Sequence, residues 1–176
     1  MRLRIKSTTL TLGIIGWIQI IGGITGLGVM ANLLLNTGQI NGPLLLIFLI
    51  GISLFIFSIY SGKKLISDKK TNTGIILSIV NQLLQVFHWK ILGYGLTYSS
   101  CIELAIGIEG LSLDFDLSAI SSTFYMAINS GSEFYLKLNL IAMLLSFVLF
   151  DILKEKKKIR VEKDNTLVTD KLSVEE

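Results

Sequence analysis

Four polar side chains inside an apolar stretch are the first residues of this sequence that could do chemistry. Residues 73–93 read TGIILSIVNQLLQVFHWKILG and include Ser78, Asn81, Gln85 and His88. On an α-helix this spacing gathers the four side chains within about 80° of one face. Lipid offers no water to satisfy such groups, so they must face other helices or a wet cavity. They could bind a polar ligand, line a conducting path or join helices.

A matching face is predicted in the first apolar run of the chain. On a helix, Gln19 shares a stripe of about 80° with glycines three or four residues away, and two glycines form a small-xxx-small pair at its edge. Glycine allows two helix backbones to approach closely, so Gln19 could hydrogen-bond to Asn81 or Gln85. The residues of this face are Gly16, Gln19, Gly22, Gly23 and Gly26.

The polar cluster of Gln19, Ser78, Asn81, Gln85 and His88 fits three roles. If the cluster only joins helices, each interhelical hydrogen bond contributes about 0.6 kcal/mol and rarely more than about 2 kcal/mol. As a ligand or sensing pocket, or as a conducting path, the cluster would use His88 as a titratable group. The predicted spans place no Asp or Glu beside this single histidine. The sequence therefore favours a role in joining helices, with a ligand pocket and a conducting path as alternatives.

An alternating pattern follows this stretch. Residues 101–109 read CIELAIGIE and residues 111–117 read LSLDFDL, with Gly110 between them. Strict alternation on both sides of a glycine is typical of a β-hairpin with one apolar and one acidic face. Residues 122–128 are β-branched and aromatic enough to supply a third strand. The alternative is that residues 101–109 form an additional helical turn or a re-entrant segment.

The outer-segment acids Glu103, Glu109, Asp114 and Asp116 lie on the acidic face of this hairpin. Their spacing differs from that of a calcium-binding loop, and on strands they should point to solvent, which argues against calcium. Because an isolated hairpin is marginal in water, we expect its apolar face to lie on the helix ends or on a second copy. Lys90 either extends to the membrane surface or pairs with one of the acids.

Catalytic and redox chemistry have few candidate residues. The chain has one histidine and one cysteine, Cys101, which excludes an intramolecular disulfide and a cysteine-built zinc site. Cys101 is either a quiet thiol or an intermolecular bridge. Because the chain lacks a Ser-His-Asp order, a phosphate loop and a histidine pair, we expect no enzyme activity, no cofactor and no metal site.

Long uncharged runs decide the class of the protein. With 51% hydrophobic residues and a mean hydropathy of +0.66, the chain is too apolar for an ordinary soluble domain. Runs of about 18 or more apolar residues are typical of transmembrane helices. The sequence predicts four spans, at about residues 10–35, 44–60, 73–93 and 134–153. The first run is too long for a signal-peptide core and lacks a cleavage site, so we interpret it as an uncleaved span.

The charges predict how the spans are oriented. Fourteen of the sixteen Lys and Arg residues lie in residues 1–9, residues 62–72 and the tail from residue 154. Basic segments that flank spans mark the cytoplasmic side rather than a nucleic-acid surface. Residues 97–133 are acidic and are predicted to lie outside. Both termini are then cytoplasmic, and residues 154–176 are expected to be a disordered tail.

These features predict an all-α integral membrane protein with four transmembrane helices. A small extracytoplasmic β-hairpin or three-stranded element is expected between the third and fourth helices. The expected function is that of a non-catalytic multi-pass protein of the cell membrane, a sensor, regulator or scaffold that acts through helix packing and its outer segment. The alternative is a small pore or transporter subunit with a polar lining from the first and third helices. The expected partners are the lipid bilayer and a second copy or another membrane protein, not nucleic acid.

Overall fold

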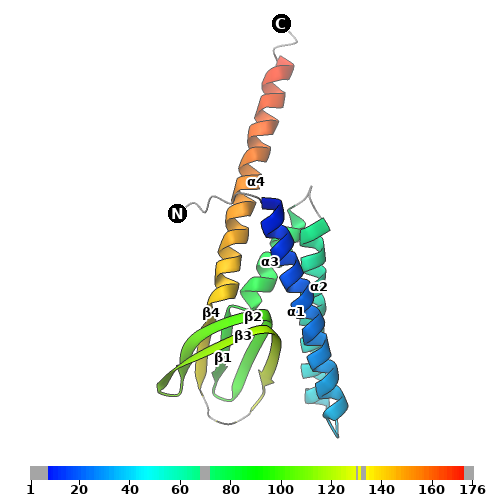
Figure 1. Ribbon diagram of the computed structural model, residues 1–176, viewed down its shortest axis with the longest axis vertical. Coiled ribbons are helices and arrows are strands. Elements are labelled where there is room, and N and C mark those ends of the chain that lie inside the picture. The colour runs from blue at the N-terminus through cyan, green and yellow to red at the C-terminus, as the bar shows by residue number, and fades with distance from the viewer. Residues whose placement is uncertain (1–7, 68–71, 130, 132–133, 173–176) are drawn as a thin grey trace.

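The computed structural model describes residues 8–67, 72–129, 131 and 134–172, and it shows four helices joined to a curved sheet (Figure 1). The helices are α1 (Thr8–Asn36), α2 (Gly42–Ser67), α3 (Thr73–Leu84) and α4 (Leu140–Leu172). The strands are β1 (Phe87–Ile91), β2 (Tyr94–Glu109), β3 (Ser112–Ala127) and β4 (Tyr135–Asn139). The prediction of an all-α fold is therefore wrong, because a four-stranded antiparallel sheet lies between α3 and α4 in the chain.

The predicted third span, residues 73–93, is a short helix followed by a strand. α3 ends where the N–H of Gln85 donates to the carbonyl of Gln82, an i→i−3 bond that closes the last turn. β1 then leads into β2 through Leu92 and Gly93, whose φ angles of 51° and 82° suit a two-residue hairpin turn. With 12 residues, α3 is about 18 Å long and too short for a hydrocarbon core of about 30 Å.

The predicted fourth span, residues 134–153, is divided in a similar way. Its first part is strand β4, and Asn139 then caps α4 by accepting the N–H groups of Ile141 at 3.1 Å and Ala142 at 3.2 Å. The apolar part of α4, residues 140–153, is only about 21 Å long. The helix continues to its last described residue through the predicted disordered tail, where Lys, Glu and Arg are strong helix formers.

Among the described residues, two helices are long and apolar enough to cross a membrane, judged by length and composition. They are α1 and α2, whose apolar windows have mean hydropathies of 1.8 and 2.5. Both carry exposed apolar side chains, among them Ile14 and Trp17 on α1 and Leu46 and Leu49 on α2. The structure thus offers two candidate spans instead of the predicted four.

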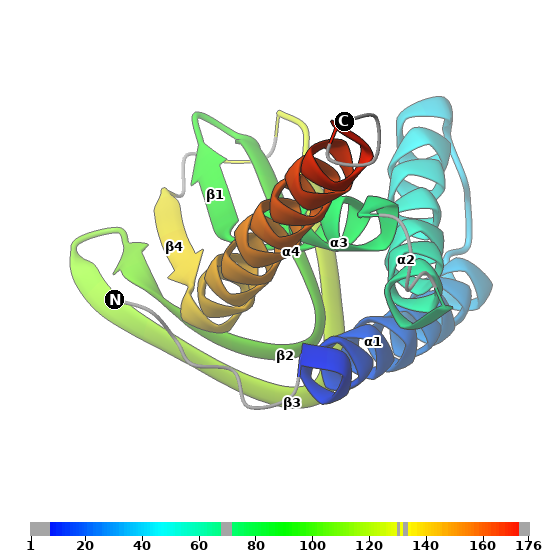
Figure 2. The ribbon, with the colours of Figure 1, turned by 90° about the horizontal axis from the view of Figure 1, so that it is seen from above.

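The sheet curls because β2 pairs with two strands in succession. The strand order is β1-β4-β2-β3; the first half of β2 pairs with β1, its second half pairs with β4, and β1 also pairs with β4. Between these halves the register shifts at Cys101 (φ 80°) and Ile102, where β3 has an additional, unpaired residue, Ile120 (φ 57°), and so forms a bulge. Figure 2 shows β2 and β3 sweeping around to face β1 and β4. The sheet therefore has an inner and an outer face.

The predicted hairpin at Gly110 is confirmed. Glu109 pairs with Ser112 across the turn, and Gly110 has a φ of 60°, which glycine adopts without strain. Both strands are longer than predicted. Most of the expected third strand, residues 122–128, is the second half of β3 and pairs with the first half of β2.

The glycine face of α1 packs on α2 and β2, and not on α3 as predicted. A Cβ at Gly23 would lie 2.7 Å from the carbonyl oxygen of Phe55 on α2, and a Cβ at Gly22 would lie 2.7 Å from the backbone nitrogen of Cys101 on β2. α3 packs instead against α2 and α4. All four predicted glycines make close contacts of this kind: Gly16, Gly22, Gly23 and Gly26.

Two apolar clusters hold the helices and the sheet together. The first joins all four helices through residues such as Leu12, Ile75 and Leu149. The second joins α1, α2 and β2 around Phe55 and Tyr98, whose ring centroids are 5.4 Å apart. The second cluster fixes the sheet beside the C-terminal half of α1 and the N-terminal half of α2, as Figure 1 shows.

Candidate functional site

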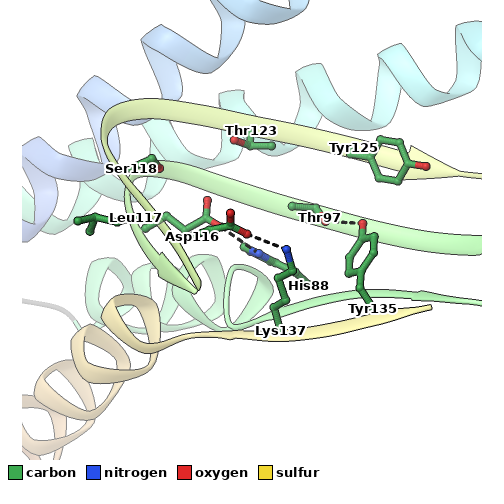
Figure 3. A pocket seen from close by; sticks show the side chains of 10 residues that line it. His88, Thr97, Asp116, Leu117, Ser118, Thr123, Tyr125, Tyr135 and Lys137 are labelled. Carbon is green, nitrogen blue, oxygen red and sulfur yellow. Dashed lines mark hydrogen bonds and ion pairs between the residues drawn. The ribbon is translucent and has the colours of Figure 1, made fainter. Parts of the chain in front are cut away.

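The inner face of the curved sheet encloses a polar pocket of about 330 Å³ (Figure 3). Every strand contributes, because alternate residues of a strand point to the same face and the polar set of each strand points inward. The lining residues are His88, Thr97, Glu103, Asp116, Leu117, Ser118, Thr123, Tyr125, Tyr135 and Lys137.

Lys137 of β4 binds three carboxylates of the β2–β3 hairpin. Its Nζ lies 3.2 Å from an oxygen of Glu109 and 2.8 Å from an oxygen of Asp116, and it also donates a hydrogen bond to Asp114. The lysine side chain is 11% exposed, and each acid is more exposed than that. The three acids are 37% to 57% exposed, so they reach solvent as predicted, but each also faces Lys137 of the supposed fourth span.

These contacts shift the pKa of both kinds of group. Burial alone would lower the pKa of Lys137, but the hydrogen bonds that it donates to Asp114, Asp116 and Glu109 outweigh burial and raise the pKa. The hydrogen bond from Lys137 holds the pKa of Asp114 below its usual range. At neutral pH the group contains three carboxylates and one ammonium. It therefore keeps two excess negative charges.

His88 and Glu103 form a second, buried pair. His88 Nδ1 lies 3.1 Å from Glu103 Oε1, and the two side chains are 2% and 8% exposed. His88 Nε2 lies 3.3 Å from the carbonyl oxygen of Tyr98, which can only accept, so Nε2 carries a hydrogen. Burial raises the pKa of Glu103, but the hydrogen bond from His88 opposes burial, and the pKa is lowered. The lowered pKa keeps Glu103 a carboxylate at neutral pH, and His88 is the partner that faces it.

The lowered pKa of Glu103 predicts a loss of stability in acid. In the unfolded chain this carboxyl titrates near 4.5, whereas in the folded protein it keeps its charge to lower pH. Its stabilisation is present above pH 4.5 and is lost as the pH falls through the folded pKa. We expect the melting temperature in detergent to fall in this acid range, and to fall less for Glu103→Gln. If the melting temperature falls equally with pH in the wild type and in Glu103→Gln, the pKa of Glu103 is not lowered as stated.

Most of the polar cluster predicted on the helices is present as a hydrogen-bonded network. Gln19 Oε1 accepts bonds from Ser61 at 3.0 Å and Ser78 at 3.2 Å, and Asn81 donates to Ser58 at 3.2 Å. The five side chains joined by these bonds are each at most 1% exposed. The two α2 serines were not predicted, although polar residues three apart on an apolar helix are a signal for such a contact. This packing favours the role in which the polar cluster joins helices through hydrogen bonds.

Strand β2 completes the network, and His88 lies outside it. The hydroxyl of Tyr98 donates to Asn81 Oδ1 at 3.1 Å, and the N–H of Ser100 donates to Gln85 Oε1 at 3.0 Å. His88 belongs to β1 and lines the pocket in the sheet. The structure therefore divides the predicted cluster between two sites: four members join helices to the sheet, and the fifth pairs with an acid of the outer segment.

Lys90 and Cys101 are each only 4% exposed. Lys90 is paired in register with Gly95 and Tyr135 in the sheet, so its predicted extension to the membrane surface is wrong. Cys101 is a free cysteine, and burial raises the pKa of its thiol. A buried, protonated thiol is unreactive, which fits a free thiol better than an intermolecular disulfide.

The arrangement presents charged and polar side chains to a pocket of ligand size. Both ring nitrogens of His88 are engaged, one by Glu103 and the other by the carbonyl of Tyr98. Within the described parts of the chain, no group of three or more His, Cys, Asp or Glu residues could hold a metal ion. The chain matches no family model, no curated protein and no solved structure.

Proposed function

We propose that the protein is a non-catalytic binding protein, held at a membrane by α1 and α2, whose curved sheet receives a small organic cation. The observation that carries this proposal is the Lys137 group, which keeps two excess negative charges beside the pocket. Of the three acids, Asp116 lines the pocket, as do Lys137 and the rings of Tyr125 and Tyr135 (Figure 3), and Lys137 Nζ lies 5.6 Å from the centroid of the Tyr135 ring. A carboxylate beside tyrosine rings is a combination that recognises ammonium groups. The volume of about 330 Å³ suits a small molecule.

Binding of a cation would change how β4 is held. An ammonium group bound to Asp116 replaces one partner of Lys137, which keeps its contacts with Glu109 and Asp114. Lys137 belongs to β4, and α4 begins directly after this strand. An exchange of partners at Asp116 therefore acts on the base of the helix that leads away from the sheet. This connection supports a role as a sensor.

We also propose that the sheet lies outside the cell and that the opposite end of the molecule faces the cytoplasm. Figure 1 shows that the C-terminal ends of α2 and α4 both lead away from the sheet. These ends carry basic residues, namely Lys63 and Lys64 on α2 and Lys154 and Lys156 on α4. Basic residues next to a span favour the cytoplasmic side. The gathering of these charges at one end supports the orientation predicted from the sequence.

Titration of the detergent-purified protein with choline tests the binding role. We expect a dissociation constant of about 1 mM or lower for choline. 3,3-Dimethylbutanol, a neutral compound of the same shape, should bind at least about tenfold more weakly because it lacks the charge. Asp116→Asn and Tyr125→Leu should each weaken choline binding about tenfold. Tyr94→Leu is the matched control, since Tyr94 does not line the pocket. Equal binding of the two compounds, or no binding of choline, would contradict the proposal.

The alternative function, a pore or transporter subunit, requires water along the polar cluster. The buried and mutually bonded side chains of Gln19, Ser78 and Asn81 favour the binding role over this alternative. We expect that cysteines at positions 81 and 85 stay unlabelled by a membrane-impermeant maleimide in intact vesicles. A cysteine at position 125, where Tyr125 is 40% exposed, should be labelled. Labelling of positions 81 and 85 at the rate of position 125 would favour the conducting path.

A further inference from the structure

The outer face of the β2–β3 hairpin is apolar and uncovered. Leu111, Leu113, Phe115 and Leu117 are between 64% and 106% exposed. Ile108, on the other strand of the hairpin, is 47% exposed and pairs in register with Leu113. Together these side chains form a contiguous patch, which we call the outer apolar face. A patch of this kind marks a contact with a membrane or another protein.

The polarity of this sheet is the reverse of that found in a water-soluble sheet. Asp114 and Asp116 alternate with the residues of the outer apolar face and turn to Lys137 on the inner side. A half-solvated antiparallel sheet normally turns its apolar side chains inward and its charges outward. Here the charges are inside and the large apolar residues are outside. Such an arrangement suits an apolar medium around the sheet.

We infer that the outer apolar face contacts the acyl chains of a lipid bilayer. The sheet is fastened to α1 near the middle of this helix, where Ser122 Oγ donates to the Gly22 carbonyl at 2.7 Å and lies 2.8 Å from the hydroxyl of Thr25. A crossing needs about 20 residues, and any such stretch within α1 contains both Gly22 and Thr25. A bilayer that surrounds α1 therefore reaches the level at which the sheet is attached. This inference rests on the membrane anchoring proposed above.

The free edge of β3 limits how deep the sheet can lie. In the described part of the chain, β3 pairs with β2 along one edge and with no strand along the other. Unpaired backbone groups on a sheet edge are not tolerated in the hydrocarbon region. The strand therefore lies at the boundary between headgroups and acyl chains, where water reaches its edge while its apolar side chains contact lipid.

Quenching by brominated phosphatidylcholine tests the inference on the full chain in vesicles. The native tryptophans, Trp17 and Trp89, are replaced by phenylalanine, and Phe115→Trp then supplies a single reporter on the outer apolar face. Its fluorescence should fall in brominated lipid, and fall more with bromines near the headgroup than with bromines deep in the chain. Leu113→Trp on the same face, at a residue that is 73% exposed and does not line the pocket, is a second reporter in case the first variant does not fold.

Two single-tryptophan controls separate the outcomes. A variant that keeps only Trp17, which is 58% exposed on α1, reports membrane anchoring itself. Tyr125→Trp in the tryptophan-free background reports the inner face and should not be quenched. Quenching of Trp17 without quenching at position 115 or 113 would overturn the inference and leave the anchoring intact. Cysteine crosslinks at position 113 that show a second copy on this face would have the same meaning. Absence of quenching at Trp17 as well would overturn both.

Discussion

Replacing Glu103 with leucine should lower the free energy of unfolding by about 3–5 kcal/mol. The substitution leaves the His88 side chain, which is 2% exposed, without the carboxylate that faces its Nδ1, and removing one partner of a buried pair is strongly destabilising. Denaturation of the detergent-purified protein, followed by circular dichroism, would measure the change. Glu109→Leu is the matched control on the same strand, because Glu109 is 57% exposed and its ion pair contributes no more than about 1 kcal/mol.

A double-mutant cycle shows whether the loss comes from the broken pair. His88→Phe alone leaves Glu103 buried without its partner and should also cost several kcal/mol, on the order of 3. The double variant removes both partners and replaces them with apolar side chains, so most of the lost stability should return. If the two losses simply add, His88 and Glu103 do not form the pair that the structure shows. A loss for Glu103→Leu no larger than that for Glu109→Leu would lead to the same conclusion.

The features that the sequence predicts correctly are those set by local patterns. The hairpin at Gly110 follows from a period of two on both sides of a glycine. The helices α1 and α2 follow from long apolar runs. The contacts of Gln19 and Ser78 follow from their positions on one helix face each. In every case the signal lies within one short stretch of the chain.

Strands β1 and β4 were missed because an apolar run conceals where a helix ends and a strand begins. Residues 87–91 read FHWKI and residues 135–139 read YLKLN, so both alternate apolar and polar residues. This alternation, together with the turn at Leu92 and Gly93, could have shown two short strands. Averaging hydropathy over about 20 residues hides patterns of only five. The pairing of β1 with β4 joins segments far apart in sequence, which no local pattern specifies.

The pocket was missed for a related reason. Alternation divides the side chains of a strand between two faces but does not indicate which face is turned to solvent. Lys137 decides this here, because it lies on β4 and binds acids of the β2–β3 hairpin from inside the curl. The sequence places Lys137 in an apolar stretch, where one charged residue near the end of a predicted span attracts little attention. A lysine and a histidine in two alternating segments were the available signal.

Replacing Gly22 with alanine should be among the most destabilising changes on α1, with a loss of about 3 kcal/mol in the free energy of unfolding. The added Cβ would lie 2.6 Å from the carbonyl carbon of Ser100 and 2.7 Å from the backbone nitrogen of Cys101. Both are backbone atoms of β2 in a buried part of the sheet, so they cannot turn aside as a flexible side chain would. The strand or the helix must move, and the bond from Ser122 to the Gly22 carbonyl would then be lost.

Replacing Gly28 with alanine should raise the free energy of unfolding instead of lowering it. Among the described residues, none comes within 4 Å of a Cβ built at Gly28, and alanine favours a helix by up to about 1 kcal/mol over glycine. The two variants share one helix and one chemical change, so effects of composition or detergent cancel between them. The difference in melting temperature therefore isolates the contact between α1 and β2. Equal melting temperatures would mean that α1 does not dock on the sheet through Gly22, and the proposed position of the sheet beside the membrane would lose its support.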